Sequence, residues 1–286
     1  MSTLFKIAGV QMDVCFQDKS ANLARIEAAM VETHRAGASL AIFPECALAG
    51  YCYDSLDECR PFAETVPGPA TDQLVAVAKR LDMYAVFGLL ERDGDRVFNA
   101  CTLVGPQGVV GHYRKVHLPY LGVDRFTTPG DRGFGVFDAG GLRVGMNICY
   151  DGAFPEAARV MALDGADLIV LPTNWPPGAE CTADCIANAR ALENAVYYAA
   201  VNRVGVERGF PFIGRSKVCD TSGRVLVCAA EPEETIIFAE IDVARARNKH
   251  IIRVPKLHEI NRFADRRPEF YGKIVEPVRV TRPPIG

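Results

Sequence analysis

The stretch LRVGMNICYD, residues 142–151, runs from a predicted strand directly into a reactive residue. Apolar residues dominate Leu142–Ile148, as in a buried strand, and the next residue is Cys149. A helix is expected to begin near Pro155, because proline is favoured in the first helical turn, and to end before Gly165. The stretch therefore predicts a strand followed by a helix, with a thiol at the end of the strand.

Two charged residues upstream stand in the same position relative to a strand. The apolar run Ser39–Phe43 ends just before Glu45, and the strand predicted over Val109–Val116 carries Lys115 near its end. Because the ends of neighbouring strands converge on one edge of a sheet, we expect Glu45 and Lys115 to meet Cys149 there. Taken singly, each has an ordinary interpretation, since strand-end charges are usually solvated and such a cysteine is usually a core thiol.

The order of the predicted elements indicates the fold class. Strands alternate with helices early in the chain, and hairpins follow the helix predicted over Thr182–Val196. There is no internal repeat and no low-complexity linker. This order predicts an α/β domain whose mixed sheets carry helices on their outer faces.

The composition is that of an ordinary globular domain. Of the 286 residues, 49% are hydrophobic and 23% are charged, and the formal net charge is −3. Nucleic-acid binding would require a strongly basic balance, so none is expected. No apolar run approaches the roughly 20 residues of a membrane helix, and the N-terminal residues show no secretory signal. We therefore expect a cytoplasmic protein with no membrane partner.

The chain has ten cysteines. There is no Cys-x-x-Cys pair, and no histidine lies close to the most closely spaced pair, Cys181 and Cys185. These features disfavour a disulfide framework, a thiol-redox protein and a zinc site, so most of the thiols are expected to be small buried apolar groups. A Cys-His thiol protease is a further rival class, but no feature of the sequence selects one of the five histidines.

Several segments resemble motifs of the nitrilase superfamily, in its amidase- and carbamoylase-like branches. The resemblance extends over residues 4–270 or so, and the segments occur in the family's order. The glutamate, lysine and cysteine motifs are Phe43-Pro44-Glu45 with Gly50-Tyr51, Tyr113-Arg114-Lys115-Val116-His117-Leu118 and Asn147-Ile148-Cys149-Tyr150-Asp151. Further matches are PTNW at residues 172–175 and NRVG at residues 202–205.

The resemblance implies a particular architecture. It is a four-layer α-β-β-α sandwich, and members usually pair through one helical face. An eight-layer homodimer, or a higher homo-oligomer, is therefore expected. Residues 1–265 would form the hydrolase domain, and residues 266–286 would form a C-terminal tail that could cross onto a partner subunit.

The resemblance also implies cysteine-dependent hydrolysis of a carbon–nitrogen bond. An amide carbon is a poor electrophile, and a thioester on Cys149 divides its hydrolysis into two easier steps. Glu45 would act as general base and acid. Lys115 would stabilise the oxyanion together with the backbone N–H of Tyr150. This chemistry needs no metal and no organic cofactor, and the partner it implies is a small amide or carbamoyl substrate.

One departure from the family pattern lies in the loop after Lys115. Members usually carry a second glutamate there, whereas this loop reads GVDRF at residues 122–126. Alignment on the Pro-Gly pair that follows puts Val123 at the glutamate position. Asp124 would replace the glutamate after a one-residue shift, bonding Lys115 or the substrate, or else it is a loop acid paired with Arg125. Asp131 is the less favoured substitute.

The substrate itself is left open by the sequence. Tyr51, Asn174 and Trp175 lie in matched segments and are expected to contact it. Tyr150 stands where true nitrilases usually carry tryptophan, which favours amide or carbamoyl substrates over nitriles. Nitrile hydrolysis by the same three residues is the alternative activity. A catalytically silent binding module is the non-enzyme alternative, and the retention of Glu45, Lys115 and Cys149 disfavours it.

Overall fold

The computed structural model describes residues 4–230 and 232–278. It divides into two compact units, Met1–Asn248 and Lys249–Gly286. The larger unit contains all the segments that carry the predicted site.

Two six-stranded sheets form the larger unit. The first has the strand order β14-β1-β2-β3-β4-β5, and the second has the order β13-β12-β9-β8-β7-β6. The first comprises β1 (Leu4–Gln11), β2 (Leu40–Ile42), β3 (Tyr84–Asp93), β4 (Arg96–Gly105), β5 (Gly108–Arg114) and β14 (Thr235–Asp242). The second comprises β6 (Val136–Ala139), β7 (Leu142–Met146), β8 (Leu168–Thr173), β9 (Tyr197–Asn202), β12 (Lys217–Cys219) and β13 (Val225–Cys228). A short ladder joins β10 (Val206–Glu207) to β11 (Phe210–Pro211).

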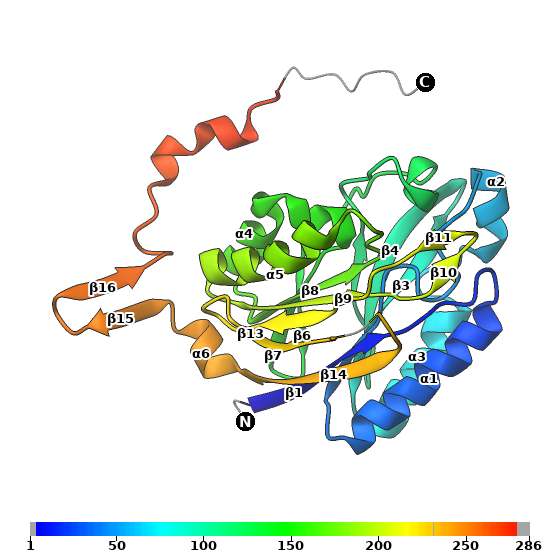
Figure 1. The fold of residues 1–286 in the computed structure, drawn as a ribbon, viewed down its shortest axis with the longest axis horizontal. Coiled ribbons are helices and arrows are strands. Elements are labelled where there is room, and N and C mark those ends of the chain that lie inside the picture. Colours follow the sequence, from blue (N-terminus) through cyan, green and yellow to red (C-terminus); the bar gives the residue numbers. More distant parts are fainter. Residues whose placement is uncertain (1–3, 231, 279–286) are drawn as a thin grey trace. The chain divides into compact units, whose positions relative to one another are not determined.

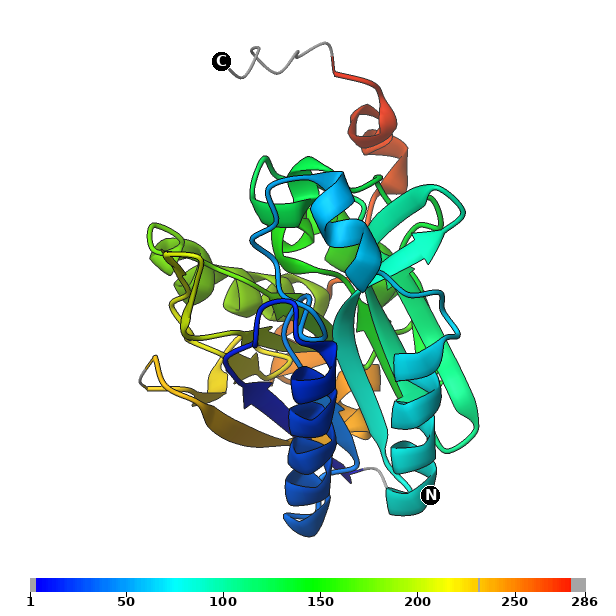
Figure 2. The same cartoon turned by 90° about the vertical axis from the view of Figure 1, so that its right-hand side faces the viewer.

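Helices cover the outer face of each sheet (Figures 1 and 2). Helices α1 (Lys19–Arg35) and α3 (Pro69–Leu81) pack on the first sheet, and α4 (Pro155–Leu163) and α5 (Glu180–Asn194) pack on the second. The shorter helices are α2 (Leu56–Cys59) and α6 (Val243–Arg247), with 3-10 turns η1 (Arg60–Phe62), η2 (Gly122–Arg125) and η3 (Cys149–Ala153).

The two sheets face each other through β1 and β9. A Cβ atom added at Gly9 in β1 would lie 3.1 Å from Cγ2 of Val201 in β9, so glycine permits this close approach. The larger unit is thus the four-layer α-β-β-α sandwich that the sequence predicted.

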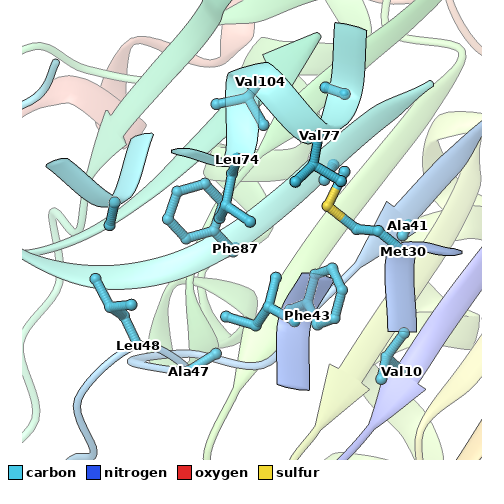
Figure 3. Close-up of a cluster of buried hydrophobic side chains, with 14 of the residues drawn as sticks. Val10, Met30, Ala41, Phe43, Ala47, Leu48, Leu74, Val77, Phe87 and Val104 are labelled. Atoms are coloured by element: carbon cyan, nitrogen blue, oxygen red, sulfur yellow. The ribbon is translucent and has the colours of Figure 1, made fainter. Parts of the chain in front are cut away.

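An apolar cluster fills the space between the first sheet and its two helices (Figure 3). Phe43, Phe87, Met30 and Leu74 are all fully buried in it. Burying a large apolar side chain contributes about 1.5–3 kcal/mol to stability. Because Phe43 lies two residues before Glu45, this packing also fixes where the chain leaves the sheet toward Glu45.

The smaller unit contains an antiparallel hairpin of β15 (His250–Val254) and β16 (His258–Asn261). Two 3-10 turns follow, η4 (Pro268–Phe270) and η5 (Gly272–Val275). The predicted domain limit at residue 265 and the predicted crossing of the tail to a partner stay predictions, and the last part of that tail, residues 279–286, lies outside the described residues. Across residues 4–230 and 232–278, no helix is long and apolar enough to cross a membrane.

Candidate active site

Glu45 is held in a tight turn directly after β2. Gly88 in β3 makes this turn possible, because a Cβ added there would lie 2.3 Å from the backbone nitrogen of Cys46. The turn is fixed by hydrogen bonds from Gly88 N to Pro44 O and from Leu48 N to Gly88 O. Glu45 is completely buried as a result.

Lys115 follows the last residue of β5 and is also completely buried. Its backbone is held on both sides, since its N–H donates to Asn99 O and its carbonyl accepts from Gly130 N, each at 2.8 Å. Its ammonium donates to Glu45 Oε1 at 2.6 Å and to Asp124 Oδ2 at 2.5 Å. The sequence prediction that Glu45 and Lys115 converge is therefore seen in the structure.

Cys149 comes from the other sheet. It follows β7 and opens the 3-10 turn η3 with a left-handed φ of 45°. A non-glycine residue in this conformation is strained, and such strain occurs most often at functional sites. The expectation that all three residues lie at one sheet edge is wrong, because β2 and β5 belong to the first sheet and β7 to the second. The group lies between the sheets, which face each other in the sandwich.

Asp151 ties the two sheets together beside Cys149. Its carboxylate accepts from Tyr113 OH at 2.7 Å, from the backbone N–H of His117 at 3.0 Å and from Ile148 N at 3.0 Å. Tyr113 and His117 flank Lys115, whereas Ile148 precedes Cys149. This carboxylate therefore fixes the lysine and cysteine segments relative to one another.

The electrostatic environment keeps the Cys149 thiol protonated at rest. Burial, reinforced by the negative charge of Glu45, raises the pKa of Cys149 to about 12, while Lys115, the Thr173 hydroxyl and the backbone N–H of Asn174 oppose the rise. A thiol with so high a pKa needs a base close by in order to react. Glu45 Oε2 has no hydrogen-bond partner among the described residues and can serve as that base.

The charges of Glu45 and Lys115 are coupled. Burial raises the pKa of Glu45, Lys115 lowers it, and Asp124 raises it again, with the net shift upward. Burial pushes the pKa of Lys115 down, but the two carboxylates outweigh it and place that pKa well above its ordinary value. Lys115 is therefore a permanent cation, and Glu45 is an acid that takes up a proton more readily than a solvated glutamate.

Asp124 lies in this cluster rather than in the solvent. It is buried in η2, and its Oδ2 accepts from Lys115 and from Tyr51 OH, the latter at 2.8 Å. Arg125 instead donates to Gly122 O and Tyr53 O, so the alternative of an Asp124–Arg125 pair is not seen.

Of the expected substrate residues, Asn174 has the most open hydrogen-bonding capacity. It is fully buried, and both atoms of its side-chain amide lack a partner within the part of the chain that the structure describes. Trp175 is buried, and its backbone N–H donates to Asn202 Oδ1 at 2.8 Å. Tyr51 is also buried and contributes its hydroxyl to Asp124. Tyr150 is 39% exposed, and its ring packs edge-on against Phe154.

Sequence reasoning missed Asn99. This fully buried residue of β4 donates from Nδ2 to Glu45 Oε1 at 2.7 Å and to Asp124 Oδ1 at 2.8 Å. The available signal was one amide side chain in the strand predicted over Val97–Val104, whose other residues are apolar except for Thr102.

Among the described residues, no group of three or more His, Cys, Asp or Glu side chains could hold a metal ion. The arrangement instead consists of a thiol, a carboxyl group, a fixed cation and several unpaired polar atoms. This combination is suited to acyl transfer through a covalent intermediate.

Residues 6–250 match the model of the carbon-nitrogen hydrolase family. The chain belongs to this family, and within the nitrilase superfamily it falls among the amidase-like branches. It is thus a hydrolase of carbon–nitrogen bonds.

Particular relatives show how far this similarity extends. The chain is 41% identical to a nitrilase of Pyrococcus abyssi, over 94% of this chain and 99% of the relative. It is 34% identical to omega-amidase NIT2 of Bos taurus, over 84% of this chain and 90% of the relative. The crystal structure of a carbon-nitrogen hydrolase from Helicobacter pylori G27 shares the fold, with a TM-score of 0.85 at 23% identity, covering 96% of this chain and 99% of that one.

Proposed function

We propose that the protein hydrolyses a small linear amide or N-carbamoyl compound through a thioester on Cys149. The observation that carries this proposal is that Oε2 of Glu45 has no hydrogen-bond partner among the described residues, while Lys115 holds the other oxygen. The charge of Glu45 raises the pKa of Cys149, so the carboxylate acts on this thiol. Of the relatives described above, the omega-amidase supports an amide substrate and the Pyrococcus nitrilase leaves a nitrile as the alternative.

In the first half-reaction, the Cys149 sulfur attacks the carbonyl carbon while Glu45 Oε2 takes the thiol proton. The carbonyl oxygen becomes an oxyanion. Two of the three N–H bonds of the Lys115 ammonium point to carboxylates, and the third is available to this oxygen. The Tyr150 N–H lies in the first turn of η3, where helix geometry leaves N–H groups without an intrahelical acceptor.

Collapse of the tetrahedral intermediate breaks the carbon–nitrogen bond. Glu45 returns its proton to the leaving nitrogen, so that ammonia or an amine departs and the acyl group stays on sulfur. In the second half-reaction Glu45 takes a proton from water as hydroxide adds to the thioester. When the carbon–sulfur bond breaks, Glu45 returns this proton to the sulfur, which releases the acid product and restores the Cys149 thiol. Asp124 holds Lys115 in place throughout.

We assign the substrate's polar contacts to Asn174, with Tyr51 and Trp175 forming walls of the site. The Asn174 amide offers one acceptor and two donors, and none of them is used by the described residues. A buried amide without partners costs free energy unless a ligand completes its hydrogen bonds. An amide or carbamoyl group presents both donors and acceptors and therefore suits this residue.

We also propose that the chain forms a homodimer through α4 and α5. Val160 and Leu163 on α4 and Leu192 on α5 are each 44% exposed, which supports an apolar helical face. Pairing through this face would give the expected eight layers. Light scattering on purified protein, with Leu192→Glu as the disrupting variant, would distinguish a dimer from a monomer.

The activity is tested with a panel of primary amides, N-carbamoyl compounds and nitriles, by measuring released ammonia. Cys149→Ala should abolish release. Cys219→Ala, which removes another buried thiol outside the site, should leave release unchanged. Release from nitriles alone would contradict the proposed substrate class. Equal loss in both variants would contradict the role of Cys149.

A further inference from the structure

The side chain of Asn99 contacts both carboxyl groups of the cluster, and its backbone holds the backbone of Lys115. Its side chain donates to Glu45 and to Asp124 as described above, and its backbone carbonyl accepts from the backbone N–H of Lys115 at 2.8 Å. Its own Oδ1 accepts from the thiol of Cys46 at 3.5 Å. Both amide hydrogens and both oxygens of this residue are therefore engaged.

This bonding explains which oxygen of Glu45 is free. Asn99 and Lys115 both donate to Oε1, whereas Oε2 has no partner among the described residues. Two donors on one oxygen fix the rotation of the carboxyl group. Without Asn99, the carboxyl group could turn and use both oxygens on the Lys115 ammonium, which would leave none for the thiol.

Asn99 also lies between two carboxylates. Asp124 raises the pKa of Glu45 by charge repulsion, and the hydrogen bond from Asn99 lowers it. An amide is neutral and does not titrate, so it remains a donor whether Glu45 is charged or protonated. It can therefore steady Glu45 through the whole proton cycle without adding charge to the site.

We propose that Asn99 is a positioning residue of this hydrolase, which holds Glu45 with Oε2 free and keeps Asp124 on Lys115. This inference rests on the proposed function, because Asn99 acts through Glu45. Its role is distinct from that of a residue that only stabilises the fold.

Asn22 provides a matched control. It is also a fully buried asparagine, and its Nδ2 donates twice, to Cys15 O at 2.7 Å and to Leu48 O at 3.0 Å. Its Oδ1 accepts from Cys15 N at 2.8 Å. It differs from Asn99 in that all its partners are backbone groups and none of its hydrogen bonds reaches the side chain of Glu45, Asp124 or Lys115.

The experiment compares Asn99→Ala, Asn99→Asp and Asn22→Ala with the wild type in two measurements. The first is the pH dependence of kcat and KM on an amide that the protein hydrolyses. The second is the pH dependence of Cys149 alkylation by iodoacetamide, followed by peptide mass spectrometry, which needs no known substrate. Urea unfolding of each variant shows how much folded protein is present.

We expect Asn99→Ala to lower kcat by about tenfold to a hundredfold with little change in KM, as for loss of a hydrogen bond to a charged group. The ascending limb of both pH profiles should move to higher pH, because Glu45 loses a bond that favours its ionised form. Asn99→Asp should move the ascending limb to still higher pH. This substitution preserves the shape of the side chain but adds a carboxylate, which disfavours the ionised form of Glu45. Asn22→Ala should lower stability and leave both profiles in place.

Unshifted profiles in both Asn99 variants would overturn the inference, as would a smaller effect of Asn99→Asp than of Asn99→Ala. If Asn99→Ala does not fold, the shift of the pH profiles in Asn99→Asp alone tests the inference. A shifted alkylation profile in a protein that hydrolyses no amide, carbamoyl compound or nitrile would support the positioning role and overturn the proposed function.

Discussion

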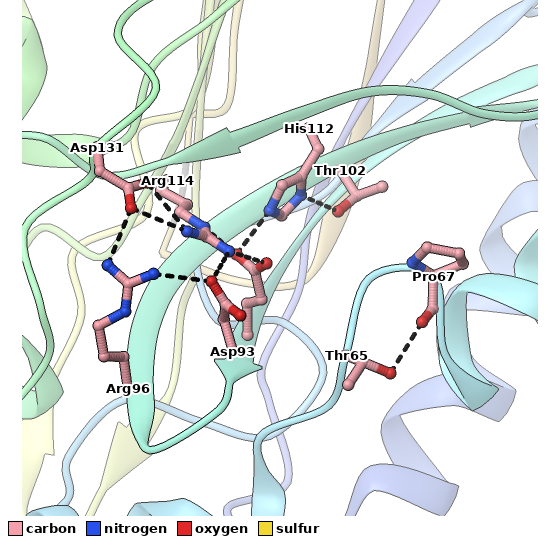
Figure 4. A network of polar contacts seen from close by, with 9 residues as sticks. Thr65, Pro67, Asp93, Arg96, Thr102, His112, Arg114 and Asp131 are labelled. Atoms are coloured by element: carbon pink, nitrogen blue, oxygen red, sulfur yellow. Dashed lines mark hydrogen bonds and ion pairs between the residues drawn. The ribbon is translucent and has the colours of Figure 1, made fainter.

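Arg114 and Lys115 are neighbours in the chain and both are buried, yet they enter two charged clusters that differ in how completely the charges are paired. Figure 4 shows Arg114 among carboxylates. Its guanidinium binds both oxygens of Glu91, at 2.7 and 2.6 Å, and both oxygens of Asp131, at 2.9 and 3.2 Å. Arg96 bridges Asp93 and Asp131 at the outer side. Every charge in this cluster therefore has a partner of opposite sign.

The two glutamates show what this difference does. Burial favours the protonated form of Glu91, but hydrogen bonds from His112 and Arg114 outweigh it and lower its pKa to about 2. Burial of Glu45 is not fully offset by Lys115, so the pKa of Glu45 is raised and one oxygen is unpaired. Complete pairing yields a stable ion pair, whereas incomplete pairing leaves a carboxyl group able to exchange a proton. Burial alone does not explain this difference, because both glutamates are buried.

The largest expected effect comes from making the same substitution, glutamate to glutamine, in each of the two clusters. Glu45→Gln keeps the shape but removes the base, so kcat/KM should fall by about 10³-fold, within the range found for general acid–base groups. Glu91→Gln should lower the free energy of unfolding and leave kcat/KM of the folded enzyme close to wild type. Steady-state kinetics and urea unfolding on both variants test this. Similar losses of kcat/KM in both variants would contradict the distinction between the two clusters.

The pH dependence of stability should sharpen the comparison. The pKa of Glu91 is lower in the folded protein than its ordinary value of 4.5. The contribution of Glu91 to the free energy of unfolding is therefore present above pH 4.5 and is lost as the pH falls toward 2. At about 1.4 kcal/mol per pKa unit, it amounts to about 3 kcal/mol.

Urea unfolding from about pH 6 to about pH 3 measures this contribution as the difference between wild type and Glu91→Gln. The difference should shrink as pH falls. A constant difference would mean that the Arg114 cluster does not hold Glu91 in its charged form.

A smaller effect is expected at Asp124. Asp124→Asn removes one carboxylate from Lys115 but keeps hydrogen bonding to Tyr51 and Asn99 possible. Loss of a charged partner from an otherwise intact hydrogen bond should lower kcat about tenfold. The pKa of Glu45 should also fall, because a negative neighbour is gone, and the ascending limb of the pH profile should move to lower pH. A shift in the opposite direction would contradict the charge balance described here.

The sequence predicted the local elements well because their signals are local. The strand expected over Leu142–Ile148 is Leu142–Met146, and the helix expected from Pro155 begins there and ends at Leu163. Apolar periodicity and a proline at the helix start depend on neighbouring residues only. The four-layer sandwich followed from the family resemblance.

What the sequence did not predict depends on contacts between distant segments. The assignment of Glu45 and Lys115 to one sheet and of Cys149 to the other is fixed by strand pairing, which no local pattern encodes. The link from Asn99 to Glu45 joins residues 54 positions apart. The family pattern indicates Asp124 as a substitute for the second glutamate, but only the structure shows that its side chain, in the turn η2, reaches Lys115.

The central claim is that the under-paired Glu45 activates Cys149 for covalent attack. Its most direct test is mass spectrometry of the enzyme quenched with acid while it hydrolyses an amide. We predict one acyl group, bound to the peptide that contains Cys149, and none when Cys149→Ala is treated alike. Turnover with no adduct on Cys149, or with the acyl group on another of the ten cysteines, would contradict the account.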